Sequence, residues 1–253
     1  MIEGKGIKPN LLSSQVVDRL EELVLDSDIR PGSTIPSESE LVERFGVSRI
    51  VIREAVRTLA TRGLIEVRQG RRPTVNVLNA TMPGDFFRMA LRQDGNALMD
   101  LIEVRWALEV HTARLAALQA AETDLEAMQV TIDMMNAKST SGTDDSEGFD
   151  DADAEFHQRL AIASGNRFMQ LLVEALKEPL RASRTASHRG RLVRGLDDRG
   201  PIEAHTRILD RVKAKDPEGT VREMEQHLED AKEDSRHSDL PLSWPRLGER
   251  GSR

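Results

Sequence analysis

Three histidines and an aspartate in the second half of the sequence have types and spacings suited to holding a metal ion. Asp153 and His157 are four residues apart, so in a helix they lie on one face and can grip one cation together. His205 and His227 each share a helical face with apolar residues, so both are expected to point inward. Burying these groups without partners would cost several kcal/mol, which a shared divalent cation would avoid. The pattern favours a metal site over ordinary core histidines.

A second set of polar residues could complete a site for a small acid. Arg105 falls on an apolar helix face with Leu101 and Leu108, where a carboxylate ligand would suit the guanidinium. An internal ion pair with Glu109, four residues further on, is the alternative. Three histidines and one carboxylate would leave metal positions open for an acid. Further effector contacts are expected from the inward-facing Asn166, Ser183 and Ser187.

The composition limits which classes of protein are possible. A chain of 253 residues with 38% hydrophobic content can form two compact domains. The absence of cysteine excludes disulfides, thiolate metal sites and a cysteine nucleophile. No apolar run approaches the roughly 20 residues of a membrane span, and the first residues lack a signal-peptide pattern. We therefore expect a cytoplasmic protein without a membrane partner.

The net charge of -7 is unevenly distributed along the chain. Residues 44–72 contain eight arginines against two acids, Glu54 and Glu66, which gives a local charge of +6. A short basic segment within an acidic protein is typical of a DNA-binding module joined to another domain.

The elements around this segment predict a winged helix-turn-helix domain over 11–78. A first amphipathic helix ends before Pro31, and a helix over 38–45 begins with the capping-box pair Ser37 and Glu40 and ends at Gly46. Ser48 can cap a helix over 49–62, in which Ile52, Val56 and Leu59 form the packing stripe, while Arg49, Arg53 and Arg57 form another face. Strands over 64–68 and 73–77 flank a turn at 69–72.

The rest of the chain reads as an all-helical domain over 85–236, after a linker over 79–84. The fold class is therefore mainly α, a winged helix-turn-helix followed by a helical bundle. Residues 139–148 are expected to form a loop, residues 1–10 a loose tail and residues 237–253 a disordered tail. The expected helices are 97–119, 123–138, 148–164, 166–188 with a kink at Pro179, 201–214 and 218–234.

Within the DNA-binding module, two arginines are placed to read bases. Arg49 and Arg53 lie early on the expected recognition helix, where arginine can donate two hydrogen bonds to guanine. A solvated basic face is the alternative. The wing turn and the two helix-capping serines can contact phosphates or the minor groove. The full set of expected DNA contacts is Ser37, Ser48, Arg49, Arg53, Gln69, Gly70, Arg71 and Arg72.

The run from Ile35 to Gly70, IPSESELVERFGVSRIVIREAVRTLATRGLIEVRQG, resembles the DNA-binding domain of GntR-family regulators. The resemblance implies that Arg49 and Arg53 contact a short palindrome and that the wing tip touches the minor groove. The chain departs from the family pattern at Ser39, where many members carry arginine. It departs again at Ile50 and Val51, where small hydroxylated residues or proline are common.

The second half resembles the FCD ligand-binding domain of FadR-type GntR regulators. The resemblance rests on the segments 105–109, 153–157, 164–166, 203–205 and 224–228. It implies an antiparallel helical bundle, with Asp153, His157, His205 and His227 as ligands of a Zn, Ni or Mn ion, zinc being the first expectation. It also implies that Arg105 binds the carboxylate of an effector.

Together these features predict a transcriptional regulator and not an enzyme. It would bind a near-palindromic operator as a homodimer, because one recognition helix reads few base pairs. We expect a repressor of a catabolic operon, released by a small carboxylic acid such as a sugar acid. A metal-dependent hydrolase tethered to DNA would need a further motif such as His-Glu-x-x-His, which is absent. A ligand-independent architectural DNA-binding protein would leave the inward-facing ionisable residues unexplained.

Overall fold

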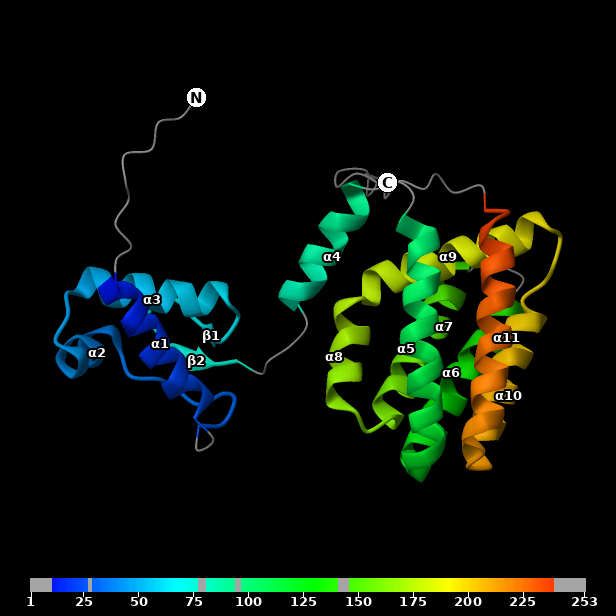
Figure 1. Ribbon diagram of the computed structural model, residues 1–253, viewed down its shortest axis with the longest axis horizontal. Coiled ribbons are helices and arrows are strands. Elements are labelled where there is room, and N and C mark those ends of the chain that lie inside the picture. Colours follow the sequence, from blue (N-terminus) through cyan, green and yellow to red (C-terminus); the bar gives the residue numbers. More distant parts are fainter. Residues whose placement is uncertain (1–10, 27–28, 77–80, 94–96, 141–145, 239–253) are drawn as a thin grey trace. The chain divides into compact units, whose positions relative to one another are not determined.

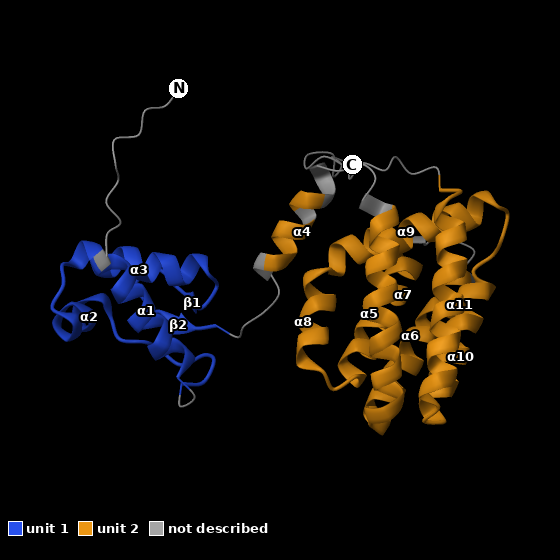
Figure 2. Cartoon of the chain, viewed as in Figure 1, with its two compact units in different colours: residues 1–82 blue, residues 83–253 orange. Residues whose placement is uncertain are grey.

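A computed structural model describes residues 11–26, 29–76, 81–93, 97–140 and 146–238 of the chain. The fold is mainly helical and divides into two compact units, Met1–Met82 and Pro83–Arg253 (Figure 2). The expected tail over 1–10, residues 239–253 of the tail expected over 237–253, residues 79–80 of the expected linker and the centre of the expected loop at 139–148 lie outside the described residues.

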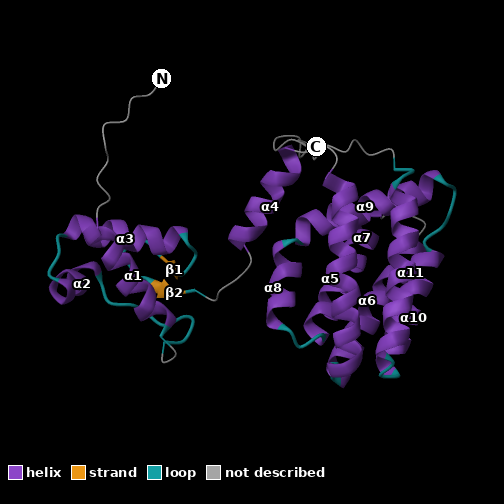
Figure 3. Cartoon of the chain, in the orientation of Figure 1, coloured by secondary structure: helices purple, strands orange, loops and turns teal. Residues whose placement is uncertain are grey.

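The first unit is a three-helix domain with a small two-stranded wing (Figure 3). Ile65 pairs with Val75 and Glu66 with Thr74 in antiparallel register, so the hairpin is shorter than the sequence predicts. Its elements are α1 (Leu11–Leu25), α2 (Glu38–Phe45), α3 (Arg49–Thr61), β1 (Ile65–Glu66) and β2 (Thr74–Val75).

Helix boundaries in this unit follow from local capping. The Ser37 side chain accepts a hydrogen bond from the Glu40 backbone N–H, and the Glu40 carboxylate accepts one from the Ser37 backbone N–H, which completes the capping box. Gly46 ends α2 with a φ of 65°, a left-handed conformation that favours glycine. Ser48 caps α3 through Val51. These predictions from the sequence are confirmed.

The second unit is an all-helical bundle, as predicted. Helix α11 packs against α5, α9 and α10, and α7 packs against α5, α6 and α9 (Figure 1). Phe156, Met128 and Leu228 are fully buried among these helices and form part of one apolar core. The helices are α4 (Thr81–Gln93), α5 (Ala97–Gln119), α6 (Glu122–Thr140), α7 (Ser146–Ala163), α8 (Arg167–Ala175), α9 (Lys177–Val193), α10 (Arg199–Lys213) and α11 (Pro217–Ser235).

Two features of the second unit differ from the sequence prediction. The single kinked helix expected over 166–188 is two helices, α8 and α9, separated at Leu176. Pro179 has no N–H to bond the carbonyl of Ala175 and its ring crowds that carbonyl, so the helix breaks there instead of bending. Helix α4 was not predicted and begins at Thr81, inside the expected linker; Pro83 is tolerated there because first-turn N–H groups have no helical partner. None of the helices described is long and apolar enough to cross a membrane.

Candidate metal centre and nucleic-acid interface

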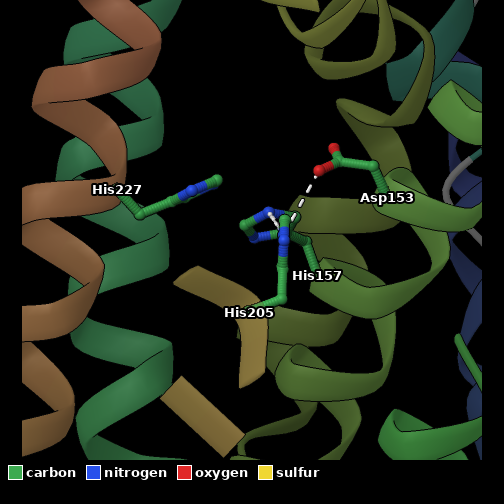
Figure 4. A group of neighbouring side chains, drawn as sticks. All are labelled: Asp153, His157, His205 and His227. Carbon is green, nitrogen blue, oxygen red and sulfur yellow. Dashed lines mark hydrogen bonds and ion pairs between the residues drawn. The ribbon is translucent and has the colours of Figure 1, made fainter. Parts of the chain in front are cut away.

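Three helices of the second unit bring the predicted ligands together. Asp153 and His157 come from consecutive turns of α7, His205 from α10 and His227 from α11 (Figure 4). All four are buried, and one ligand atom of each lies within 4.8 Å of the others. The structure therefore confirms that the four side chains predicted from sequence converge on one point.

The contacts of two imidazoles leave their Nε2 atoms facing each other. Nδ1 of His205 donates to the carbonyl oxygen of Pro201 at 2.7 Å, which places the proton on Nδ1. Nδ1 of His157 lies 2.9 Å from a Glu109 carboxylate oxygen, which favours the same tautomer. The two Nε2 atoms are 3.3 Å apart, and that of His205 is also 3.2 Å from Asp153 Oδ1. Neutral imidazoles of this tautomer would direct lone pairs at one another, an arrangement that a bound cation would stabilise.

His227 supplies an independent test of whether a metal ion fits. Its Nε2 is buried and has no hydrogen-bond partner among the described residues. Burial, with His205 and His157 nearby, holds the pKa of His227 well below its ordinary value. Burial also lowers the pKa of His157 to about 4, outweighing the opposite influence of Glu109. Metal binding needs neutral imidazoles, so the donor set fits a divalent ion.

Glu109 is the central anion beside the cluster. Its carboxylate accepts hydrogen bonds from Arg105 Nε at 3.1 Å and from Arg184 Nη2 at 2.6 Å, in addition to its contact with His157. Burial raises the pKa of Glu109, but the positive charges of Arg105 and Arg184 outweigh it and hold the pKa well below its ordinary value. Carboxylates in this position commonly orient metal-bound histidines. Glu109 thus joins the two arginines to the buried His and Asp cluster.

Arg105 forms the internal ion pair that the sequence analysis gave as the alternative. It is 1% exposed, and its Nε and Nη2 atoms donate to Glu109. Its Nη1, however, is buried without a hydrogen-bond partner among the described residues, and Arg105 lines a cavity beside the cluster. The ion pair therefore leaves the Nη1 amino group of Arg105 available to an acid.

The cavity beside the cluster is bordered by charged and hydroxyl side chains. Ser187 lines it, and its hydroxyl donates to the carbonyl of Ala231 on α11. Ser183 is buried and its hydroxyl lacks a partner among the described residues, but it is not part of the cavity wall. The wall comprises Arg105, Phe149, Asp150, Asp153, Arg184, Ser187, His188, Arg191, Pro201, His227, Ala231 and Asp234.

The structure places Asn166 away from this cavity, contrary to the expected effector contact. Asn166 is exposed, and its side-chain oxygen caps α8 by accepting from the backbone N–H groups of Phe168 and Met169. Asparagine is favoured at helix N-caps for this reason. Its side-chain oxygen is used in this cap, and Asn166 does not line the cavity.

Sequence reasoning missed Arg184, which connects Glu109 to Asp153 of the buried cluster. Its Nε lies 3.0 Å from Asp153 Oδ2, and Arg184 is 6% exposed. The signal was present, because Arg184 lies three residues before Ser187, and residues three apart share a helix face. Burial lowers the pKa of Arg184, but an arginine remains charged at neutral pH.

A second buried histidine centre was also missed. His188 on α9 contacts Asp150 on α7 through Nδ1 at 2.7 Å and Asp198, which precedes α10, through Nε2 at 2.9 Å. Thr185 donates a further hydrogen bond to Asp150. Burial lowers the pKa of His188, but the two aspartates outweigh it and raise the pKa to about 9. The charged imidazole therefore ties three helices together.

We expect the stability of the second unit to fall as the pH rises from 6.5 to 9. His188 has a pKa of about 9 when folded against an ordinary value of 6.5, so its contribution is complete below pH 6.5 and is lost as pH rises through 9. The loss should be at most about 3 kcal/mol. Urea unfolding followed by circular dichroism at both pH values measures it. His188→Gln should flatten this dependence, and an equally steep dependence in that variant would contradict the assignment.

The first unit presents its predicted DNA contacts on the surface. Arg49 and Arg53 are exposed at the start of α3, while Ile52, Val56 and Leu59 are buried beneath them, as predicted. At the wing, Gly70 adopts a φ of 72°, which lets the tip turn tightly between the exposed Gln69, Arg71 and Arg72.

Residues of α2 hold three of these arginines in the free protein. Arg49 donates to Ser39 Oγ at 3.0 Å, and Arg53 pairs with Glu38 at 3.4 Å. Arg72 of the wing pairs with Glu40 at 2.7 Å. Such exposed pairs contribute little stability, so the arginines can exchange them for other partners.

Comparison with known proteins gives the same two-part organisation. Residues 12–75 match the model of the bacterial regulatory proteins of the gntR family, and residues 100–230 match the FCD domain. The chain is 31% identical over 218 residues to the uncharacterized HTH-type transcriptional regulator YcbG of Bacillus subtilis, covering 86% of this chain and 87% of that protein. It is 27% identical over 230 residues to a putative L-lactate dehydrogenase operon regulatory protein of Escherichia coli, covering 88% and 85%.

A solved structure supports the relation across both units. The structure described as Streptococcus agalactiae GntR matches with a TM-score of 0.69 and 28% identity, covering 87% of this chain and 98% of that one. The winged first unit fits the gntR match, and the helical second unit with its buried His and Asp cluster fits the FCD match. The chain therefore belongs to the GntR family of bacterial regulatory proteins, as a DNA-binding transcriptional regulator with a C-terminal FCD domain and not an enzyme.

Proposed function

We propose that this regulator is a metabolite-responsive repressor, released from its operator by a small carboxylic acid bound beside a divalent metal ion. The observation that carries the proposal is the buried cluster of Asp153, His157, His205 and His227 next to a cavity lined by Arg105 and Arg184. A cation and two guanidinium groups at one cavity favour an anionic ligand.

Zinc is the metal we expect first. Three imidazole nitrogens and one carboxylate oxygen suit Zn²⁺, and Ni²⁺ or Mn²⁺ would accept the same donors with more coordination positions. When bound, the ion would supply a Lewis-acidic centre for an oxygen atom of the acid. The protein's own residues fix the donors: Glu109 and the Pro201 carbonyl orient two of the histidines.

The effector would be small and hydroxylated. The free Nη1 of Arg105 and the Ser187 hydroxyl border the cavity, so a carboxylate with neighbouring hydroxyl groups finds both charged and neutral partners. Ser183 has a buried hydroxyl without a described partner, and we keep it as a candidate contact. The relative described as a putative L-lactate dehydrogenase operon regulatory protein favours hydroxy acids, and sugar acids share this chemistry.

The first unit would bind a near-palindromic operator as half of a homodimer. Arg49 and Arg53 would contact base edges, and Ser37, Ser48 and the wing residues 69–72 would contact the backbone or the minor groove. A regulator of this kind works where bacterial DNA lies, so we infer a cytoplasmic location.

Arg49→Ala and Arg53→Ala should each weaken operator binding, by about 1–3 kcal/mol if one bidentate base contact is lost. Fluorescence anisotropy with a duplex selected by the wild-type protein from a random pool measures the change. Arg19→Ala is the matched control, because Arg19 is exposed on α1 and pairs only locally with Glu22 among the described residues. Wild-type affinity in both α3 variants would show that this helix does not read the operator.

The acid response is tested with the same complex. Hydroxylated and dicarboxylic acids are titrated into the protein–operator complex. Only acids of the effector class should lower the fluorescence anisotropy, because they release the duplex. An acid that strengthens the complex would contradict the release mechanism, and so would a complete lack of response across the panel.

A further inference from the structure

Ile50 is an exposed apolar residue at the start of α3. It is 78% exposed, whereas its neighbour Ile52 is fully buried in the core of the first unit. Ile50 is the second residue of the helix after the cap Ser48, directly after Arg49 and three residues before Arg53. A large apolar side chain is thus displayed at the end of the helix expected to enter the major groove.

The surroundings of Ile50 leave this side chain uncovered. Arg49 donates a hydrogen bond to Ser39 and Arg53 forms an ion pair with Glu38, so both neighbouring guanidinium groups contact α2. Single exposed apolar residues are common on protein surfaces and need no explanation by themselves. The position of Ile50 sets it apart from such residues, because any DNA that approaches Arg49 and Arg53 meets Ile50 as well.

The major groove offers one apolar group to such a side chain. Thymine carries a C5 methyl group there, next to its O4 acceptor, and apolar side chains contact it. Cytosine has no C5 methyl group, and the purines present polar edges. An isoleucine cannot hydrogen-bond to base edges, so its contribution to sequence reading is restricted to this methyl contact and to the exclusion of water.

We propose that Ile50 is a specificity-determining residue that selects a thymine within each half-site through its C5 methyl group. The inference rests on the proposed operator-reading role of α3 and adds the base that the arginines do not specify. Arg49 and Arg53 would select guanine, and Ile50 would require thymine close to those positions.

Replacing thymine with uracil tests the methyl contact directly, because uracil pairs with adenine as thymine does and lacks only that group. The probe is a duplex selected by the wild-type full chain from a random pool, with uracil placed at one thymine at a time. Wild-type protein should lose affinity about fourfold at one thymine of a half-site, the factor expected for one buried methyl group. It should be indifferent to the other substitutions.

Ile50→Ala provides the second arm of the experiment. The variant should fold, since Ile50 is exposed, and should bind the thymine duplex more weakly than wild type. Uracil at the sensitive position should then have no further effect. Leu25→Ala is the matched control, because Leu25 is 54% exposed at the end of α1, and it should keep the wild-type uracil penalty.

Each outcome bears on a defined part of the proposal. An equal uracil penalty in wild type and Ile50→Ala would overturn the role of Ile50, and so would a wild-type protein that is indifferent to every uracil. Either result would leave operator reading by the arginines intact. Failure of the wild-type chain to enrich any duplex would instead overturn the operator-reading function, and the role of Ile50 with it.

Discussion

Glu109→Ala is expected to lower the free energy of unfolding of the second unit by about 3–5 kcal/mol, the usual cost of breaking a buried ion pair from one side. The substitution leaves the guanidinium groups of Arg105 and Arg184 buried without their shared partner, and it removes the carboxylate beside His157. Urea unfolding followed by circular dichroism measures the loss. Glu103→Ala is the control, because Glu103 is exposed on the same helix.

Glu109→Gln separates stability from metal binding. Glutamine keeps an acceptor for the arginines but no longer carries the negative charge that favours the required tautomer of His157. We expect metal affinity to fall about 10–100-fold, as for other residues that orient metal ligands. Calorimetric titration with Zn²⁺ into metal-free protein measures it. Wild-type stability in Glu109→Ala, together with wild-type metal affinity in Glu109→Gln, would mean that Glu109 does not organise this site.

Removal of the metal ion is expected to have the second large effect. An ion that binds only the folded state stabilises it by mass action, which amounts to about 3 kcal/mol when free metal exceeds the dissociation constant a hundredfold. Dialysis against a chelator should therefore lower the melting temperature, and Zn²⁺ should restore it. His227→Ala should abolish the restoration, whereas His111→Ala should not, since His111 is exposed and outside the cluster.

The same preparations test whether metal and arginine serve one acid site. Acid affinity should fall in metal-free protein and in Arg105→Ala, while Arg105→Ala should still bind metal and operator. Unchanged acid affinity in Arg105→Ala would restrict Arg105 to its pair with Glu109. If removal of the metal leaves the melting temperature unchanged, the histidines are ordinary core residues and not metal ligands.

Sequence periodicity was enough to locate the buried His and Asp cluster. Asp153 and His157 are fixed by helical spacing, and the apolar neighbours of His205 and His227 determine which way those helices face. The capping signals at Ser37, Glu40 and Ser48 likewise gave the boundaries of α2 and α3, because these signals act within a few residues.

Long-range pairing is what the sequence could not supply. The contact between Glu109 and Arg184 joins residues on α5 and α9 that are 75 positions apart, and that between His188 and Asp150 spans 38 positions. No local pattern specifies which buried charge meets which. Asn166 is a different case, since an asparagine after glycine is as well suited to capping a helix as to binding a ligand.

The acidic partners of the reading arginines also influence how binding responds to ionic strength. If Arg53 and Arg72 contact the duplex as proposed, binding would displace Arg53 from Glu38 and Arg72 from Glu40, and the carboxylates left behind would attract cations from solution. This uptake offsets part of the counterion release that normally drives association with DNA. The logarithm of the binding constant should therefore decrease less steeply with the logarithm of salt concentration than the number of arginine contacts implies, so that operator occupancy would depend less on ionic strength.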